Sequence, residues 1–148
     1  MKLINAVTAM AIFFGSVQVV QAAQSFDVDM QVRNGMPDTV QLTSASWPLG
    51  DATPESFALV GGAGHIIGLS YEDETKGQAT FSYSAPGGKS CLFTAGHDIK
   101  ESFGWFKSDK TPYQWAEAKS QGSFVATCTA KVTSYDPGKG YKVKFWMK

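Results

Sequence analysis

The sequence predicts an all-β protein: an antiparallel β-sandwich or a jelly-roll-like barrel of about seven or eight short strands, with at most one short helix. Two observations carry this prediction. Apolar and polar residues alternate along most of the chain, and clusters of glycine, proline, asparagine and aspartate interrupt the alternation at short intervals.

The alternation is clearest in residues 26–33, where every second residue is apolar and the residues between are polar. This period is typical of an antiparallel strand with one buried and one wet face. The same reasoning predicts further strands over residues 39–46, 65–71, 78–84, 90–95, 124–133 and 141–147, and turns over 34–38, 72–77, 85–89 and 136–140.

Two segments depart from the strand pattern. Residues 47–64 are rich in glycine and proline, so we expect a mostly irregular connection with a short strand at 57–60. Residues 112–119 predict a helix of at most two turns, because Pro112 suits a first helical turn and Gly122 suits a stop.

The first 22 residues have the three parts of a cleavable signal peptide. Lys2 gives a positive start, residues 3–20 are apolar and uncharged, and Ala22 ends a small-residue cleavage site, with Ala23 as the alternative. A membrane anchor is the competing interpretation, but polar residues dilute the apolar run and no cluster of lysine or arginine follows it. The sequence therefore predicts an exported protein, located in a bacterial periplasm or secreted, with residues 23–148 as a single domain and no transmembrane segment after cleavage.

Cys91 and Cys128 are the only cysteines. In an oxidising compartment such a pair predicts a disulfide, and two free buried thiols are the alternative. Both residues fall on the apolar side of their predicted strands, which favours the bridge because sheet packing can bring inward-facing cysteines together.

The charge balance limits the classes of ligand. The chain has 13 basic and 13 acidic residues, a formal net charge of zero, so it has no electrostatic footprint for nucleic acid or for an anionic membrane. Several lysines gather near the C-terminus, and we interpret them as a solvated sheet face or a protected edge: Lys131, Lys139, Lys142, Lys144 and Lys148.

No motif predicts a cofactor or a metal. The glycines at 61–64 lack the spacing and the following helix of a dinucleotide loop, and the acidic residues 72–74 lack the alternation of a calcium loop. His65 and His97 have no metal-ligand spacing. His97 with Asp98 is the one pair from which a hydrolytic site could be built, although no serine lies in a nucleophile elbow.

The least ordinary segment is 103–115, which holds five aromatic residues. Such a cluster can stack on sugars, anchor a protein contact or enter a lipid interface. We expect instead that the segment folds over the open end of the sandwich and buries its rings as a satellite core, and we keep the binding surface as the alternative. The candidate binding residues are Phe103, Trp105, Phe106, Tyr113 and Trp115.

These observations favour an exported, non-enzymatic binding module for a protein, glycan or membrane-surface ligand. One version is a periplasmic inhibitor or immunity protein. Another is a secreted, surface-active protein of the virulence type. The alternative from a different class is a small secreted hydrolase that uses His97 and Asp98.

Overall fold

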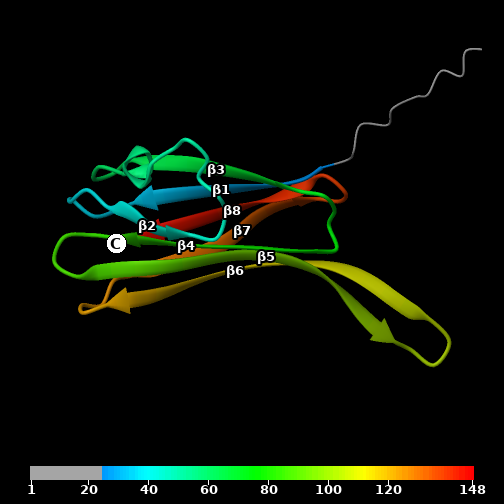
Figure 1. The fold of residues 1–148 in the computed structure, drawn as a ribbon. Helices are drawn as coiled ribbons and strands as arrows, with labels where there is room; N and C mark the ends of the chain where they lie inside the picture. Colours follow the sequence, from blue (N-terminus) through cyan, green and yellow to red (C-terminus); the bar gives the residue numbers. More distant parts are fainter. Residues whose placement is uncertain (1–24) are drawn as a thin grey trace, which may run out of the picture.

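The computed structural model describes residues 25–148, and the predicted signal peptide lies outside the described residues. Eight strands and one 3-10 turn form the domain (Figure 1). Their bounds are β1 Phe26–Asn34, β2 Gln41–Ala45, η1 Pro54–Phe57, β3 Gly64–Tyr71, β4 Lys76–Ser84, β5 Lys89–Phe103, β6 Ser108–Gly122, β7 Cys128–Asp136 and β8 Gly140–Met147.

The strands make two four-stranded sheets, with the orders β3-β1-β8-β7 and β2-β4-β5-β6. The predicted all-β sandwich is confirmed. The pairing is antiparallel except between β1 and β8, which run parallel in the middle of the first sheet. A parallel pair is possible there because the chain visits the second sheet between these two strands, which gives it the long crossover that parallel pairing requires. No helix of the described residues is long and apolar enough to cross a membrane.

The core lies between the sheets and follows from the two-residue period. Every second residue of β1 from Phe26 to Val32 is buried, and so is every second residue of β8 from Tyr141 to Met147. Phe145 of the first sheet packs on Phe81 and Phe93 of the second, with ring centroids 5.2 and 5.0 Å apart. Such aromatic pairs dominate core energetics because each ring buries a large apolar area.

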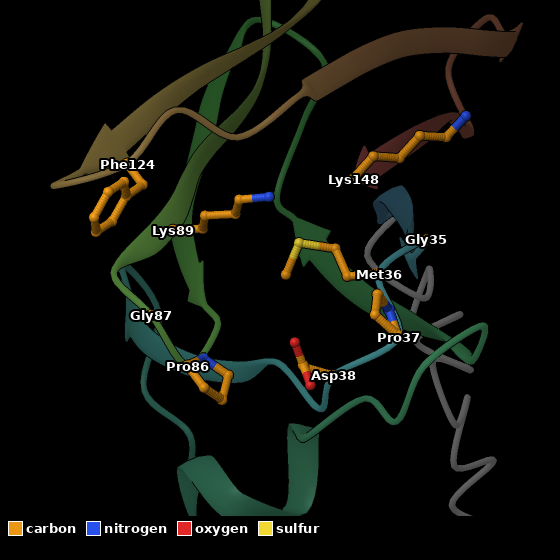
Figure 2. Close-up of a pocket in the computed structure, with 9 residues that line it drawn as sticks. All are labelled: Gly35, Met36, Pro37, Asp38, Pro86, Gly87, Lys89, Phe124 and Lys148. Atoms are coloured by element: carbon orange, nitrogen blue, oxygen red, sulfur yellow. The ribbon is translucent and has the colours of Figure 1, made fainter.

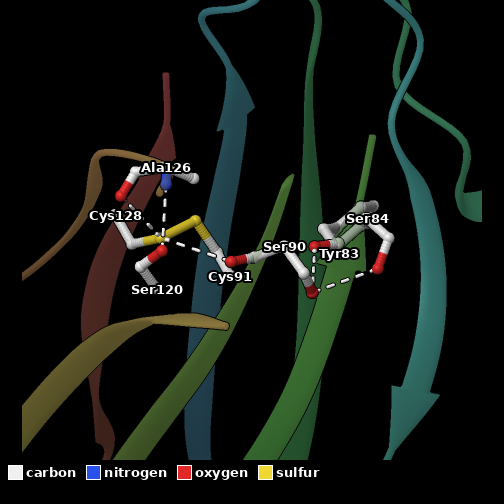
Figure 3. The surroundings of a disulfide bond; sticks show 7 residues. All are labelled: Tyr83, Ser84, Ser90, Cys91, Ser120, Ala126 and Cys128. Atoms are coloured by element: carbon white, nitrogen blue, oxygen red, sulfur yellow. Dashed lines mark hydrogen bonds between the residues drawn. A yellow bond between two sulfur atoms is a disulfide. The ribbon is translucent and has the colours of Figure 1, made fainter. Parts of the chain in front are cut away.

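The predicted disulfide is confirmed. Cys91 of β5 and Cys128 of β7 are bonded, with their Cα atoms 5.8 Å apart, so the bridge joins the two sheets (Figure 3). Ser120 of β6 lies beside it and its hydroxyl accepts a hydrogen bond of 2.9 Å from the backbone N–H of Ala126. This contact holds the connection between β6 and β7 against the bridge.

The predicted helix over 112–119 is wrong. Its residues belong to β6, which pairs with β5 along its whole length. The alanine, glutamate and lysine content gives the segment a good helix propensity, but a full ladder of cross-strand contacts outweighs propensity. Pro112 is tolerated because β6 is the edge strand of its sheet.

Three predicted boundaries also differ. The strand expected from residue 124 begins only at Cys128, and Phe124 is 64% exposed instead of buried. The strand expected at 57–60 is reduced to a single bridge between Leu59 and Val40, preceded by η1. The strand expected over 90–95 extends to Phe103.

Candidate functional site

The projecting part of the β5–β6 hairpin is the most unusual feature of the fold. Both strands have 15 residues, but β4 pairs with β5 only as far as Asp98. Beyond it, five residue pairs from Ile99–Pro112 to Phe103–Ser108 hold β5 and β6 to each other. This two-stranded ribbon extends the hairpin by roughly 17 Å, and Figure 1 shows it reaching beyond the rest of the sandwich.

The apex of the ribbon is a short turn that carries three aromatic side chains. The backbone N–H of Gly104 donates to the carbonyl of Lys107 at 2.9 Å and closes the turn. Phe103, Trp105 and Phe106 are 83%, 98% and 99% exposed. The expected satellite core is therefore wrong for these three residues, because the hairpin carries them away from the open end of the sandwich.

The other two aromatic residues of the segment lie on the shaft and base of the hairpin. Tyr113 is 41% exposed, and the Lys100 ammonium lies 3.5 Å from the centre of its ring. Trp115 is half-buried and lies across Gly96, its directly paired neighbour on β5. The structure thus divides the five predicted residues into three at the apex and two that support it.

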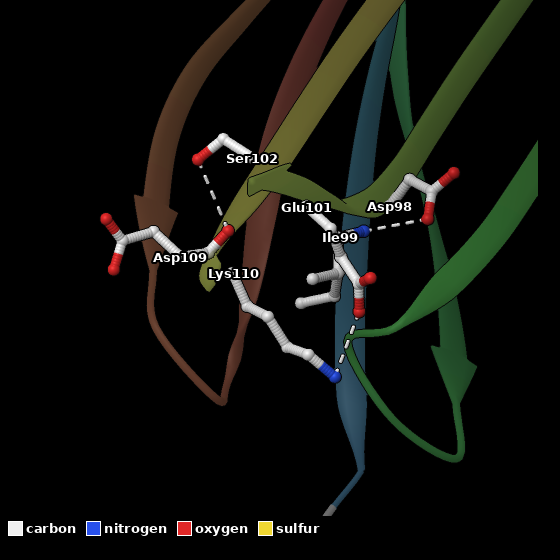
Figure 4. Close-up of polar contacts among 6 residues, drawn as sticks. All are labelled: Asp98, Ile99, Glu101, Ser102, Asp109 and Lys110. Carbon is white, nitrogen blue, oxygen red and sulfur yellow. Dashed lines mark hydrogen bonds and ion pairs between the residues drawn. The ribbon is translucent and has the colours of Figure 1, made fainter. Parts of the chain in front are cut away.

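The charged groups of the ribbon are satisfied within the ribbon. Lys110 pairs with Glu101 at 3.0 Å, and Ser102 donates to the carbonyl of Asp109 at 3.5 Å (Figure 4). Lys107 pairs with Asp109 at 3.3 Å. The ribbon has three basic residues, Lys100, Lys107 and Lys110, and two acidic ones, Glu101 and Asp109. Asp98, the last β5 residue before the ribbon, brings the acidic count to three.

His97 and Asp98 do not form a pair. His97 is only 2% exposed, and its ring packs on Phe26, Tyr71 and Tyr141 with centroids 4.7, 4.8 and 5.6 Å away. Asp98 is exposed and accepts a 2.7 Å hydrogen bond from the N–H of Ile99. Adjacent strand residues point to opposite faces, so this carboxylate cannot orient the imidazole as a catalytic base requires.

The His97 ring is a polar group in an aromatic cage. Neither of its nitrogens makes a hydrogen bond of ordinary length and angle to the described residues, and the backbone of Asp73 lies near enough only for a weaker polar interaction. Burial lowers the pKa of His97 below its usual value, while the backbone of Asp73 and the carboxylates of Asp73, Asp98 and Glu74 oppose this shift. No sequence pattern indicates this cage, because its three rings come from three separate strands, β1, β3 and β8.

A pocket of about 570 Å³ lies at the opposite end of β5 from the apex. Figure 2 shows the side chains of Lys89, Met36 and Asp38 directed into it, with Phe124 at one rim. Its charged side chains are exposed or half-buried, so solvent screens them strongly. The pocket offers charges of both signs beside a thioether but no buried polar group that would fix a ligand.

The outer face of the first sheet carries lysines, as predicted, and also Trp146. The Trp146 ring has the Lys148 ammonium 4.4 Å and the Arg33 guanidinium 5.3 Å from its centre. Of the lysines on β7 and β8, Lys142 pairs with Asp29 at 3.6 Å. This face is therefore basic, in contrast to the balanced ribbon.

The described residues contain no group of three or more histidine, cysteine, aspartate or glutamate side chains that could hold a metal ion. Comparison with models of known protein families, with curated protein sequences and with solved structures finds no match to this chain.

Proposed function

We propose that this protein is an exported binding module that contacts its ligand through the apex of the β5–β6 hairpin. The observation that carries the proposal is the nearly complete exposure of Phe103, Trp105 and Phe106 within four consecutive positions. The predicted signal peptide supports the exported location.

The size of the exposed aromatic surface supports a binding role. A phenylalanine or tryptophan side chain can bury about 150–250 Å², so three of them together offer roughly 450 Å² or more. This much exposed apolar area gathered at one apex marks an interaction site far more often than an isolated exposed residue does. The three side chains are not part of the core, so a role in folding does not account for their presence.

The ribbon is suited to present these side chains. The ion pair between Glu101 and Lys110 joins directly opposed positions, and Lys100 covers the ring of Tyr113. At the base, Trp115 lies across Gly96. These contacts tie the two strands together on the way to the apex, and so they favour a defined presentation of the aromatic residues over a loose loop.

A comparison of variants tests the proposal. The double variant Trp105→Ala/Phe106→Ala removes most of the apex, and Phe124→Ala is the matched control because it removes an exposed phenylalanine at the other end of β5. All three proteins are screened against phosphatidylcholine vesicles, a glycan array and the exported proteins of the same cells. We expect a ligand that wild type and Phe124→Ala bind and the double variant does not. The proposal fails if the double variant retains every interaction of the wild type.

A further inference from the structure

We propose that the ligand of the apex is an electrically neutral lipid–water interface, such as a phosphatidylcholine surface, into which the three aromatic side chains insert. This inference rests on the proposed function and names its ligand class. Three properties of the ribbon favour a lipid interface over a protein or glycan surface: its charge balance, its backbone hydrogen bonding and the shape of its apex.

The charges of the ribbon give no net attraction to an anionic surface. Its three basic residues are balanced by Glu101, Asp109 and the adjoining Asp98, and both Lys107 and Lys110 are held by carboxylates within the ribbon. Lys100 lies over the ring of Tyr113. A surface that attracted the ribbon through charge would need unpaired ammonium groups. A neutral interface needs none.

The backbone groups that face each other inside the ribbon are already hydrogen bonded. The ladder runs to the pair Phe103–Ser108, and the N–H of Gly104 donates to the carbonyl of Lys107. Unpaired peptide groups are costly to transfer into an apolar medium, so only internally bonded backbone enters lipid readily. The peptide groups on the outer edges of the two strands and at the tip of the turn lie outside this ladder, so they would stay in water or at the level of the headgroups while the aromatic side chains insert.

The apex has the composition and shape of an interfacial anchor. Trp105 has an apolar ring and one N–H donor, which is why tryptophan gathers where lipid tails meet headgroups. Phe103, Trp105 and Phe106 make no ring-to-ring contact with any described residue, so all three are free to enter a soft medium. A ribbon of roughly 17 Å is longer than the 5–10 Å depth of interfacial insertion, so the sandwich itself stays in water.

A protein or glycan partner is a weaker fit for the same geometry. Such partners are recognised through directed hydrogen bonds beside the apolar contact. Near the apex the ammonium of Lys107 and the N–H of Gly104 are both engaged within the turn. The remaining groups offer apolar area and few directed hydrogen bonds. A lipid interface does not require directed hydrogen bonds.

Vesicle binding of the whole protein tests this inference. Wild type, Phe106→Ala, Trp105→Ala/Phe106→Ala and Phe124→Ala are sedimented with phosphatidylcholine vesicles, with and without added phosphatidylglycerol, at low and high salt. Brominated lipids report the depth of Trp105 through quenching of its fluorescence. The unfolding midpoint of each variant in urea confirms that it is folded.

We expect wild type to bind both kinds of vesicle equally, without weakening in high salt, since apolar contact is not screened. Loss of one fully inserted aromatic side chain should lower the partition coefficient roughly ten- to a hundredfold. Phe124→Ala should bind as wild type does, and brominated lipids should quench wild type and Phe106→Ala more than the double variant.

Three results would overturn the inference: no binding to phosphatidylcholine, equal binding by the double variant, or salt-sensitive binding to phosphatidylglycerol alone. The last would point to the basic face around Arg33 and Trp146 instead. If vesicles are ignored but the double variant loses a protein or glycan ligand, the lipid inference fails and the proposed function stands. If the double variant loses no interaction, both fail.

Discussion

The indole of Trp115 lies so close to Gly96 that a Cβ atom at position 96 would be only 2.3 Å from two of its ring carbons. The two residues are directly paired across β5 and β6, just inside the point where the ribbon leaves the sandwich. Glycine leaves a gap in a strand, and an aromatic ring from the neighbouring strand can fill it. Trp115 and Gly96 therefore form the anchor on which the projecting hairpin depends.

Replacing Gly96 with alanine should destabilise the protein by about 1–3 kcal/mol, because the added methyl group must displace the Trp115 ring. The matched control is Gly68→Ala in β3. There the nearest atom to a new Cβ is a carboxylate oxygen of Asp29 at an ordinary 3.8 Å. This control should leave stability unchanged or raise it slightly. Urea denaturation measures both changes, and equal midpoints for the two variants would refute the anchor.

Breaking the bridge between Cys91 and Cys128 should lower stability by about 4 kcal/mol, because the bond closes a separation of 37 residues in the unfolded chain. The urea midpoint should fall when reductant is added to wild type, and the Cys91→Ala/Cys128→Ala variant should show no response to reductant. An unchanged wild-type midpoint under conditions that free both thiols would contradict this account.

Stability should fall as the pH drops below about 6.5, and His97 should be the cause. In the unfolded chain this imidazole takes up a proton near pH 6.5, whereas burial lowers its pKa in the folded state. Between the two pKa values the unfolded chain binds more protons, so acid favours unfolding. The contribution of neutral His97 to stability is fully present above pH 6.5. It is lost as the pH falls from there through the lower pKa of the folded state.

Two variants isolate this effect. His97→Phe keeps a ring between Phe26 and Tyr71 and removes the titration, so its stability should no longer decline in this range. His65→Gln removes the other, exposed histidine and should leave the decline intact. A decline that persists in His97→Phe would show that His97 is not its cause.

The two-layer architecture could be predicted from the sequence because burial on one face imposes a two-residue period. Residues 26–33 and 141–147 show this period without interruption, and both became strands at the centre of a sheet. The disulfide was also predictable, since strand parity placed both cysteines inward. These inferences depend only on local alternation and on the compartment.

The ribbon could not be predicted in the same way, because both of its faces are wet and the period disappears. From Lys100 to Lys110 every described side chain is exposed, so no alternation of buried and exposed residues indicates a strand there. One signal was present: Glu101 and Lys110 stand at mirrored positions about the Trp105–Phe106 turn, as opposed charges do on paired strands. The neighbouring helix-favouring composition masked it.

The apex and the anchor should respond oppositely to the loss of a tryptophan. Trp105 is 98% exposed, so Trp105→Ala should change the free energy of unfolding by no more than about 0.5 kcal/mol. Trp115 is half-buried against Gly96, so Trp115→Ala should cost about 2 kcal/mol and loosen the base of the hairpin.

Urea denaturation measures the free energy of unfolding of Trp105→Ala and Trp115→Ala. Hydrogen exchange of the amides of β6 shows where the structure opens. Faster exchange along β6 in Trp115→Ala but not in Trp105→Ala would place the mechanical support of the ribbon at its base. A loss of stability in Trp105→Ala as large as that in Trp115→Ala would mean that the apex ring packs on the protein in solution. In that case the Trp105 ring would not be free to bind a ligand.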